Sequence, residues 1–333
     1  MVAVINKTRP GLATTHTPPR ARGPRGGRSG RPGAAQAAPG PATARDWIAG
    51  ARIRTLPLSI APVLIGFGAA TVIDAPGIWH PVRGALCLAV GIFLQIGVNY
   101  ANDYSDGVRG TDQYRVGPSR LTGSGKASPR TVLIVALSFF AAGALAGLAL
   151  VILTHYWWIL LVGAVTIAAA WFYTGGKRPY GYYALGEVFV FIFFGLVATA
   201  GTTFMLTGCV NQESWLGATV AGLIACAVLM VNNIRDIEPD RLAHKHTLAA
   251  LLGTIWSRIV FCVFLLVAFL ILAFIALLYP FAWLGMFALL AAIPACVITL
   301  FARTPRELVT ALQLTSASGL LVALALGAAY TLA

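Results

Sequence analysis

The chain has 333 residues, of which 58% are hydrophobic and only 11% are charged, and its mean hydropathy is +0.79. Globular domains in water carry roughly 25% charged residues, so this composition excludes an ordinary soluble domain. The formal net charge is +13, but most Lys and Arg residues lie in the N-terminal tail and between apolar runs. That pattern is typical of membrane topology signals and disfavours a nucleic-acid partner.

Residues 1–44 differ from the rest of the chain, because Pro, Gly, Ala and Arg dominate them and Asp and Glu are absent. Such a segment cannot bury enough apolar surface to fold alone, so we predict a basic, disordered tail that lies against anionic lipid. A transit peptide is the alternative interpretation of these residues. We assign residues 45–333 to a membrane domain.

From about residue 46, apolar runs follow one another, each near the ~20 residues that an α-helix needs to cross a bilayer. No run alternates between polar and apolar residues over about ten positions, which disfavours a transmembrane β-barrel. We therefore predict an all-α, polytopic membrane protein with nine transmembrane helices. The predicted spans are residues 47–73, 84–107, 131–153, 156–173, 184–207, 215–235, 257–278, 282–301 and 307–331.

The distribution of positive charge predicts the orientation of these spans. With nine crossings, the tail shares one side of the membrane with the loops after spans two, four, six and eight. Of the 24 Lys and Arg residues, only Arg83 falls on the other side. Because cytoplasmic loops carry the excess of Lys and Arg, we place the N-terminus in the cytoplasm and the C-terminus across the membrane.

A first polar cluster closes the second predicted span. Asn99, Asn102, Asp103 and Asp106 follow the spacing i, i+3, i+4, i+7, which puts all four on one face of a helix. Neighbours at this spacing stand about 5–6 Å apart, close enough to share a divalent ion. Without such an ion, the two carboxylates would repel each other.

A second cluster closes the sixth span, where Asn232, Asn233, Asp236 and Asp240 follow one another. Spans two and six are an even number of crossings apart, so both clusters emerge on the same side and can converge. Charged residues near hydrocarbon are costly and are kept mainly for substrate or ion handling. We therefore predict a central cavity that opens near the cytoplasmic face.

Basic residues follow both clusters. Carboxylates repel a diphosphate and cations attract it, so the two occur together most simply where metal ions bridge them. This pattern predicts a Mg²⁺ site with two ions that binds a diphosphate ester and helps diphosphate to leave. The basic residues in and after the clusters include Arg109, Arg115, Arg120, Lys126, Arg235, Arg241 and Lys245.

These residues resemble the UbiA-type intramembrane prenyltransferases, in which two Asp-rich motifs close the second and sixth of nine helices. The resemblance covers about residues 46–331 and is nearest to the branch that acts on 1,4-dihydroxy-2-naphthoate. The segments that carry it are 51–57 (ARIRTLP), 99–112 (NYANDYSDGVRGTD), 115–118 (RVGP), 173–181 (YTGGKRPYG) and 232–236 (NNIRD). The third position of the first motif is Gly110, and Asp112 lies two residues further on, as is common in that branch.

The resemblance implies roles for these residues. Asp103, Asp106, Asp236 and Asp240 would be catalytic, and the metal ligands would be these four with Asn102, Asp112 and Asn232. The residues expected to bind diphosphate are Tyr173 and Lys177, which match the family's YxxxK motif, with Arg115, Arg120, Arg235 and Lys245. We assign Arg54 and Asn99 to the aromatic substrate.

The resemblance also implies the reaction. A polyprenyl diphosphate loses diphosphate, and the ring of 1,4-dihydroxy-2-naphthoate attacks the allylic cation and loses carbon dioxide, giving demethylmenaquinone at the plasma membrane. Two alternatives stay open: another acceptor, such as 4-hydroxybenzoate or a tetrapyrrole, and an ion-coupled transporter. Transporter sites usually lie near the bilayer midplane, whereas both clusters close their spans at the cytoplasmic end.

Overall fold

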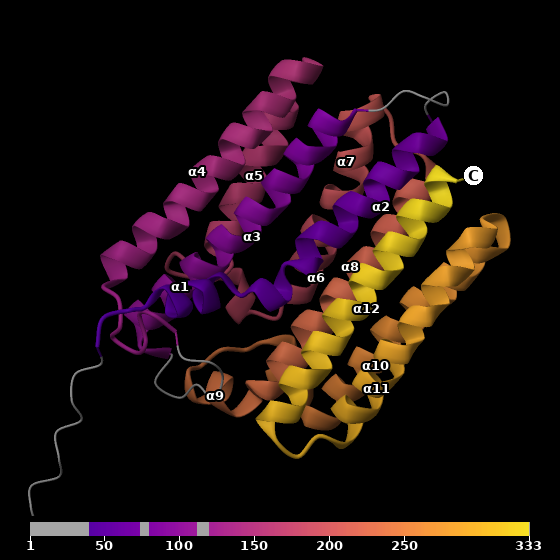
Figure 1. The fold of residues 1–333 in the computed structure, drawn as a ribbon. Helices are drawn as coiled ribbons and strands as arrows, with labels where there is room; N and C mark the ends of the chain where they lie inside the picture. The colour runs from indigo at the N-terminus through magenta and orange to yellow at the C-terminus, as the bar shows by residue number, and fades with distance from the viewer. Residues whose placement is uncertain (1–39, 74–79, 112–119, 333) are drawn as a thin grey trace, which may run out of the picture. The chain divides into compact units, whose positions relative to one another are not determined.

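The computed structural model of the chain describes residues 40–73, 80–111 and 120–332, and within these ranges it is all-helical (Figure 1). This confirms the predicted fold class. Asp112 and Arg115 lie outside the described residues, as does most of the predicted tail.

The first half of the described chain contains the helices that carry the first polar cluster. A bent pair comes first, formed by α1 (Ala44–Ala51), a short 3-10 turn (Ile53–Thr55) and α2 (Pro57–Ile73). The bend of 45° lies between Thr55 and Pro57, and α1 ends at Arg52, whose φ of 53° is in the left-handed region. After it come α3 (Pro81–Arg109), α4 (Pro129–Thr154), α5 (Ile159–Phe172) and a 3-10 turn, η3 (Tyr180–Tyr182).

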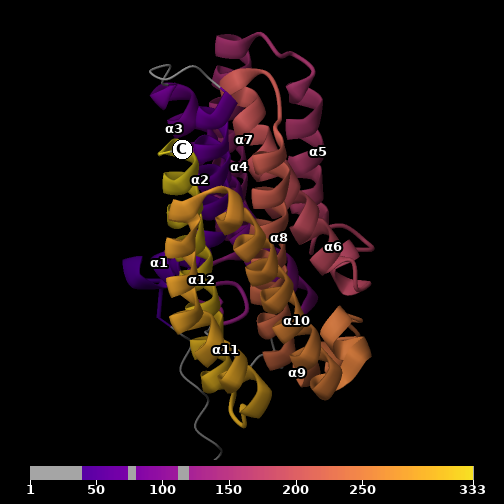
Figure 2. The same cartoon turned by 90° about the vertical axis from the view of Figure 1, so that its right-hand side faces the viewer.

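The second half begins with one continuous helix, Gly186–Thr207, made of α6 (Gly186–Val190), a π-helical segment (Phe191–Val197) and α7 (Ala198–Thr207). It continues with α8 (Gln212–Arg235), the short α9 (Ile237–Leu242) and α10 (Leu248–Leu278). The last helices are η5 (Pro280–Ala288), α11 (Leu289–Phe301) and α12 (Pro305–Thr331). Figures 1 and 2 show α12 lying between α2 and α11.

Small residues let the helices approach closely. A Cβ added at Gly68 of α2 would lie 2.6 Å from the backbone of Gly327 in α12, and one at Gly195 would lie 2.7 Å from Gly222 in α8. Such contacts are typical of membrane helices, which pack by van der Waals contact because lipid is as apolar as their side chains. The largest core cluster joins α2, α8, α10 and α12 and contains fully buried Met230, Phe261 and Tyr330.

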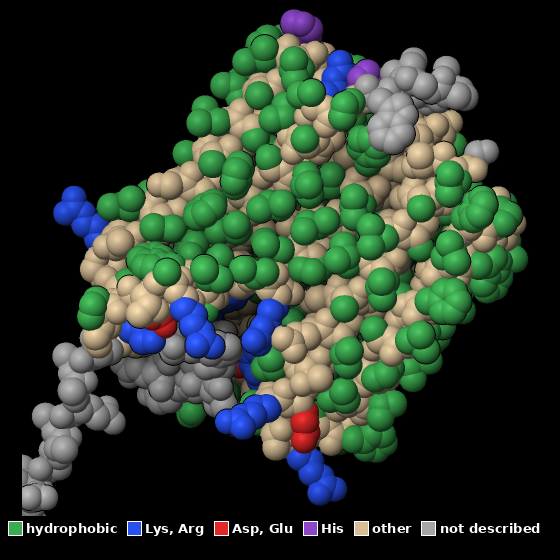
Figure 3. Space-filling model, viewed as in Figure 1, with side chains coloured by type: hydrophobic (Ala, Val, Ile, Leu, Met, Phe, Trp, Pro, Cys, Tyr) green, Lys and Arg blue, Asp and Glu red, His purple; other side chains and the backbone are tan. Residues whose placement is uncertain are grey.

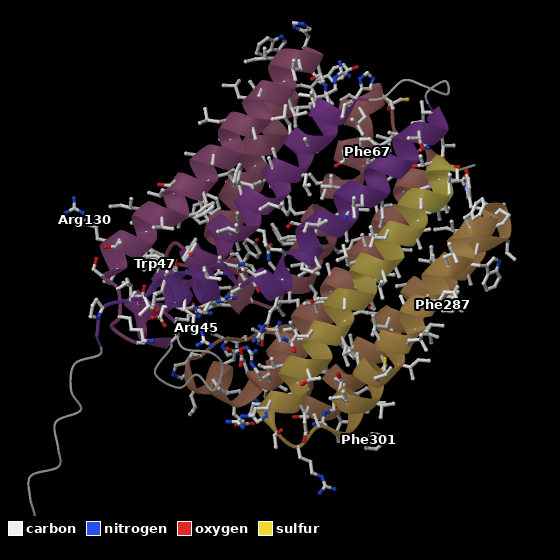
Figure 4. All side chains as sticks on the ribbon, viewed as in Figure 1. Arg45, Trp47, Phe67, Arg130, Phe287 and Phe301 are labelled. Atoms are coloured by element: carbon white, nitrogen blue, oxygen red, sulfur yellow. The ribbon has the colours of Figure 1, made fainter. Side chains whose placement is uncertain are left out.

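Seven described helices are long and apolar enough to cross a membrane, and the bent pair would make eight. The prediction of nine spans is not confirmed, because α5, which falls in the predicted span 156–173, has only 14 residues. Hydrophobic side chains cover the visible helix faces in Figure 3. Figure 4 shows Phe287 and Phe301 pointing away from the helices, and their side chains are 67% and 74% exposed, as suits a lipid-facing surface.

Candidate active site

A cavity of about 580 Å³ lies between the helices of the first half, the continuous helix Gly186–Thr207 and α8. Apolar residues of α2, α3, α4, α5, α7 and α8 form most of its wall. Its polar lining includes residues at the ends of α3 and α8, and Figure 3 shows Lys and Arg side chains around a hollow near α1. The charged lining residues are Arg52, Asp106, Arg120, Asp236, Asp240 and Lys245.

Asp106 lies at the centre of the polar contacts and is only 2% exposed. Arg120 Nη1 donates to its Oδ2 at 2.5 Å, while Lys245 Nζ and the Tyr182 hydroxyl donate to its Oδ1 at 3.1 Å and 2.8 Å. Lys245 follows α9, so its contact with Asp106 joins the end of α3 to the segment that follows α8 and α9. The predicted convergence of the two clusters is therefore confirmed.

The other members of the first cluster contact different groups. Asn102 lines the cavity, and its Oδ1 accepts a hydrogen bond of 2.6 Å from the Thr174 hydroxyl. Asn99 also lines the cavity, but its Nδ2 donates to the carbonyl of Ala51 at 2.9 Å and so ties α3 to α1.

Asp103 differs from its neighbours because it is not part of the cavity lining. Its two carboxylate oxygens accept hydrogen bonds from the backbone N–H groups of Leu121 and Thr122, at 2.8 Å and 2.9 Å. Both oxygens thus hold the segment next to Arg120, and this geometry does not support the prediction that Asp103 binds metal. The helical spacing could not reveal this, because the partners come from a loop 18 residues away.

In the second cluster, Arg235 donates to both oxygens of Asp236, with Nε at 2.8 Å and Nη2 at 2.5 Å. The same Nη2 donates to Asn232 Oδ1 at 2.9 Å. Asp236 and Asn232 line the cavity, whereas Arg235 does not. Arg235 therefore orients these two side chains from outside the lining. Its predicted role in binding diphosphate stays a prediction.

Asp240 lies on α9, beyond the end of α8, and lines the cavity near Asp106 and Asp236. Its Oδ2 accepts a hydrogen bond of 3.3 Å from the Thr247 hydroxyl. Burial raises the pKa of Asp240 to about 6, and repulsion from the other two carboxylates adds to this, although Lys245 opposes it. A divalent cation would relieve this repulsion.

Three further predicted residues lie in different environments. Tyr173 lines the cavity. Lys177 and Arg54 are exposed and do not contribute to the lining, so the structure does not bring them to the other site residues. Arg52 lines the cavity instead of Arg54, because the chain turns at Arg52.

Two contacts of the segment after α5 were not predicted from the sequence. Arg109 donates to the carbonyls of Thr174, at 2.5 Å, and Gly176. Two cations lie over the ring of Tyr182, with the Arg109 guanidinium 5.3 Å and the Lys245 ammonium 4.6 Å from its centroid. The segment 173–181 carried the family resemblance, but Tyr182 lies one residue beyond it, and nothing in its spacing indicated a contact with Asp106.

The donor atoms fit Mg²⁺ by their chemistry. Asp106, Asp236 and Asp240 supply carboxylate oxygens, and Asn102 and Asn232 supply amide oxygens, which are the hard donors that this ion prefers. In the part of the chain that the structure describes, no three Asp, Glu, His or Cys side chains are close enough to hold an ion as they stand. Arg120, Lys245 and Arg235 instead neutralise the carboxylates.

Comparison with known proteins agrees with this geometry. Residues 59–308 match the model of the UbiA prenyltransferase family. The chain is 45% identical to the 1,4-dihydroxy-2-naphthoate octaprenyltransferase of Mycobacterium tuberculosis over 284 residues, which are 85% of this chain and 96% of that protein. It is 36% identical to the enzyme of the same name from Escherichia coli, over 64% of this chain and 70% of that protein.

Solved structures support the fold. A UbiA homologue from Aeropyrum pernix aligns with a TM-score of 0.60 at 17% identity, covering 78% of this chain and 96% of that one. A UbiA homologue from Archaeoglobus fulgidus, bound to DMAPP and Mg²⁺, aligns with a TM-score of 0.55 at 15% identity, covering 85% and 99%. From the family match and the sequence identities together, the chain belongs to the UbiA prenyltransferase family.

Proposed function

We propose that this protein transfers a polyprenyl group from polyprenyl diphosphate to 1,4-dihydroxy-2-naphthoate in the plasma membrane. One observation supports this most: Asp106, Asp236 and Asp240 meet Arg120 and Lys245 at the polar part of a largely apolar cavity. The names of the relatives support the naphthoate acceptor.

Asp106, Asp236 and Asp240, with Asn102 and Asn232, would hold two Mg²⁺ ions. When bound, these ions supply charge neutralisation for the diphosphate and make it a better leaving group. Arg120 and Lys245 now pair with the carboxylate oxygens of Asp106. When substrate binds, the two cations would pair with the oxygens of the diphosphate instead. Charge-assisted hydrogen bonds from these two side chains then stabilise the charge that builds up on the leaving group.

The apolar wall would hold the isoprenoid chain and keep water from the allylic cation. Tyr173, Phe189 and Phe193 present aromatic rings to this cavity, and the π-face of such a ring attracts a cation. Arg52, the basic residue of the lining nearest the start of α2, would bind the carboxylate of the aromatic acid.

The C–O bond of the prenyl ester breaks and diphosphate leaves with the electron pair. The naphthoate carbon that bears the carboxylate forms the new C–C bond. Its bond to the carboxylate then breaks, carbon dioxide leaves, and the electron pair of that bond stays with the ring and restores its aromaticity. The product is demethylmenaquinol, the reduced form of demethylmenaquinone.

A product assay tests the proposal. Purified protein in nanodiscs is given a polyprenyl diphosphate, Mg²⁺ and either 1,4-dihydroxy-2-naphthoate or 4-hydroxybenzoate, with and without EDTA. We expect prenylated naphthoquinol, lost with EDTA. Prenylated hydroxybenzoate alone would contradict the acceptor, and no product with either acid would contradict the reaction.

Two matched variants test the metal site in the same assay. We expect Asp236→Ala to abolish transfer, because the loss of one carboxylate disrupts the whole metal site. Glu238→Ala is its control, since Glu238 is two residues away, its side chain is 79% exposed and it is not part of the cavity lining. Equal activity of folded Asp236→Ala and the control in saturating Mg²⁺ would contradict the assignment.

A further inference from the structure

Tyr182 lies where the end of α3 meets the segments after α5 and α9. Its backbone carbonyl accepts a hydrogen bond of 3.0 Å from the N–H of His246, and the N–H of the preceding Gly181 donates to the Tyr173 carbonyl, also at 3.0 Å. The backbone at Tyr182 is therefore held from the α5 side and from the segment that carries Lys245. This fixes where its side chain can point.

The side chain contacts both charged partners of the site. The hydroxyl donates to Asp106 Oδ1 at 2.8 Å, and Lys245 Nζ donates to the same oxygen at 3.1 Å. The Lys245 ammonium also lies over the Tyr182 ring, and Arg109 lies over the ring as well. One tyrosine thus contacts a carboxylate of the first cluster and a cation that follows the second.

Tyr182 differs in charge from the other two side chains that donate to Asp106. Arg120 and Lys245 are cations, and a divalent metal on the same carboxylate would repel them at short range. The Tyr182 hydroxyl is neutral, so it can keep its hydrogen bond to one oxygen of Asp106 while the other oxygen binds a metal. Hydrogen bonds of this kind fix the orientation of metal-binding carboxylates.

We infer that Tyr182 is a positioning residue that orients the Asp106 carboxylate toward the metal with its hydroxyl and keeps the Lys245 ammonium over its ring, ready to bind the diphosphate. This inference rests on the proposed function, because it takes Asp106 to be a metal ligand. It adds a residue outside both Asp-rich motifs. The two groups of the side chain have separate roles: the ring attracts the Lys245 ammonium, and the hydroxyl holds the Asp106 carboxylate.

Tyr182→Phe removes the hydroxyl and keeps the ring. Tyr183→Phe is the matched control, because Tyr183 is the next residue and its side chain is 54% exposed. Binding of Mn²⁺ in the presence of inorganic pyrophosphate is measured by electron paramagnetic resonance on wild type and both variants. Loss of a partner behind a metal ligand typically weakens metal affinity about 10- to 100-fold, and we expect at least a tenfold loss for Tyr182→Phe and none for Tyr183→Phe.

A second readout separates positioning from a general structural defect. In the transfer assay, Tyr182→Phe should need more Mg²⁺ for half-maximal rate but recover most of the wild-type kcat at saturating Mg²⁺. A kcat that stays low at every Mg²⁺ concentration, or wild-type Mn²⁺ affinity in Tyr182→Phe, would overturn the inference. If wild type itself bound no Mn²⁺ with pyrophosphate, the proposed metal site would fail and this inference with it.

Discussion

Asn in place of Asp103 would disturb the hydrogen bonds that hold the segment next to Arg120. Both oxygens of Asp103 accept from backbone N–H groups, at 2.8 Å and 2.9 Å, and the residue is 2% exposed. An Asn side chain has one oxygen, so one N–H keeps an acceptor while the other faces the new NH₂ group. Losing a hydrogen bond to a charged group and leaving a buried donor unpaired together destabilise this local structure by about 3 kcal/mol.

This loss should affect diphosphate binding more than metal binding. Leu121, whose N–H binds Asp103, is next to Arg120, which donates to Asp106. We therefore expect Asp103→Asn to lower the apparent Tm in detergent by several degrees and to raise the KM for prenyl diphosphate. The Mg²⁺ concentration at half-maximal rate should stay within about twofold of wild type, because Asp103 does not line the cavity.

Asp106→Asn is the comparison for this experiment, since it alters a carboxylate of the lining three residues away on the same helix. We expect that variant to need far more Mg²⁺. If Asp103→Asn raised the Mg²⁺ requirement as much as Asp106→Asn does, Asp103 would be a metal ligand, as the helical spacing alone predicts, and the reasoning from its backbone contacts would be refuted.

Two further predictions concern the substrates. Arg52→Ala should raise the KM for the aromatic acid about tenfold or more, because a charge-assisted hydrogen bond is lost. Arg54 is exposed, so Arg54→Ala should leave this KM unchanged. Equal effects of the two substitutions in a steady-state assay would contradict the assignment of Arg52. Gly201 lies on the cavity wall with open space at its Cβ position, about four turns along the helix from Gly186. Gly201→Phe should fill that space and weaken the binding of long polyprenyl diphosphates by about 1–3 kcal/mol. Their KM should rise roughly tenfold relative to that of geranyl diphosphate. An unchanged preference between long and short prenyl diphosphates would show that the prenyl chain lies elsewhere.

The helical clusters could be predicted because their information is local. A spacing of i, i+3, i+4, i+7 places Asn99 to Asp106 along one helix, and an even number of crossings brings Asp236 to the same side. The contact between Lys245 and Asp106 confirms that the two ends meet. Length and hydrophobicity were enough for the all-helical class, while α5 is shorter than its predicted span because its helix begins only at Ile159.

The direction of individual side chains could not be predicted, because it depends on contacts between segments far apart in the sequence. Asp103 and Asp106 are equivalent by spacing, yet Asp103 accepts hydrogen bonds from the backbone of a loop and Asp106 lines the cavity. Arg52 and Arg54 are similarly equivalent until the left-handed turn at Arg52 places one on the cavity and the other outside. Tyr182 carries no pattern of its own, and only tertiary structure brings it to Asp106.

The most direct measurement of the central claim follows the carboxylate of the acceptor. Purified protein is given polyprenyl diphosphate, Mg²⁺ and 1,4-dihydroxy-2-naphthoate labelled at the carboxyl carbon, and released carbon dioxide is counted against diphosphate and prenylated product. We expect equal amounts of all three, each abolished by EDTA. Diphosphate released without labelled carbon dioxide, or a prenylated product that keeps the label, would contradict it.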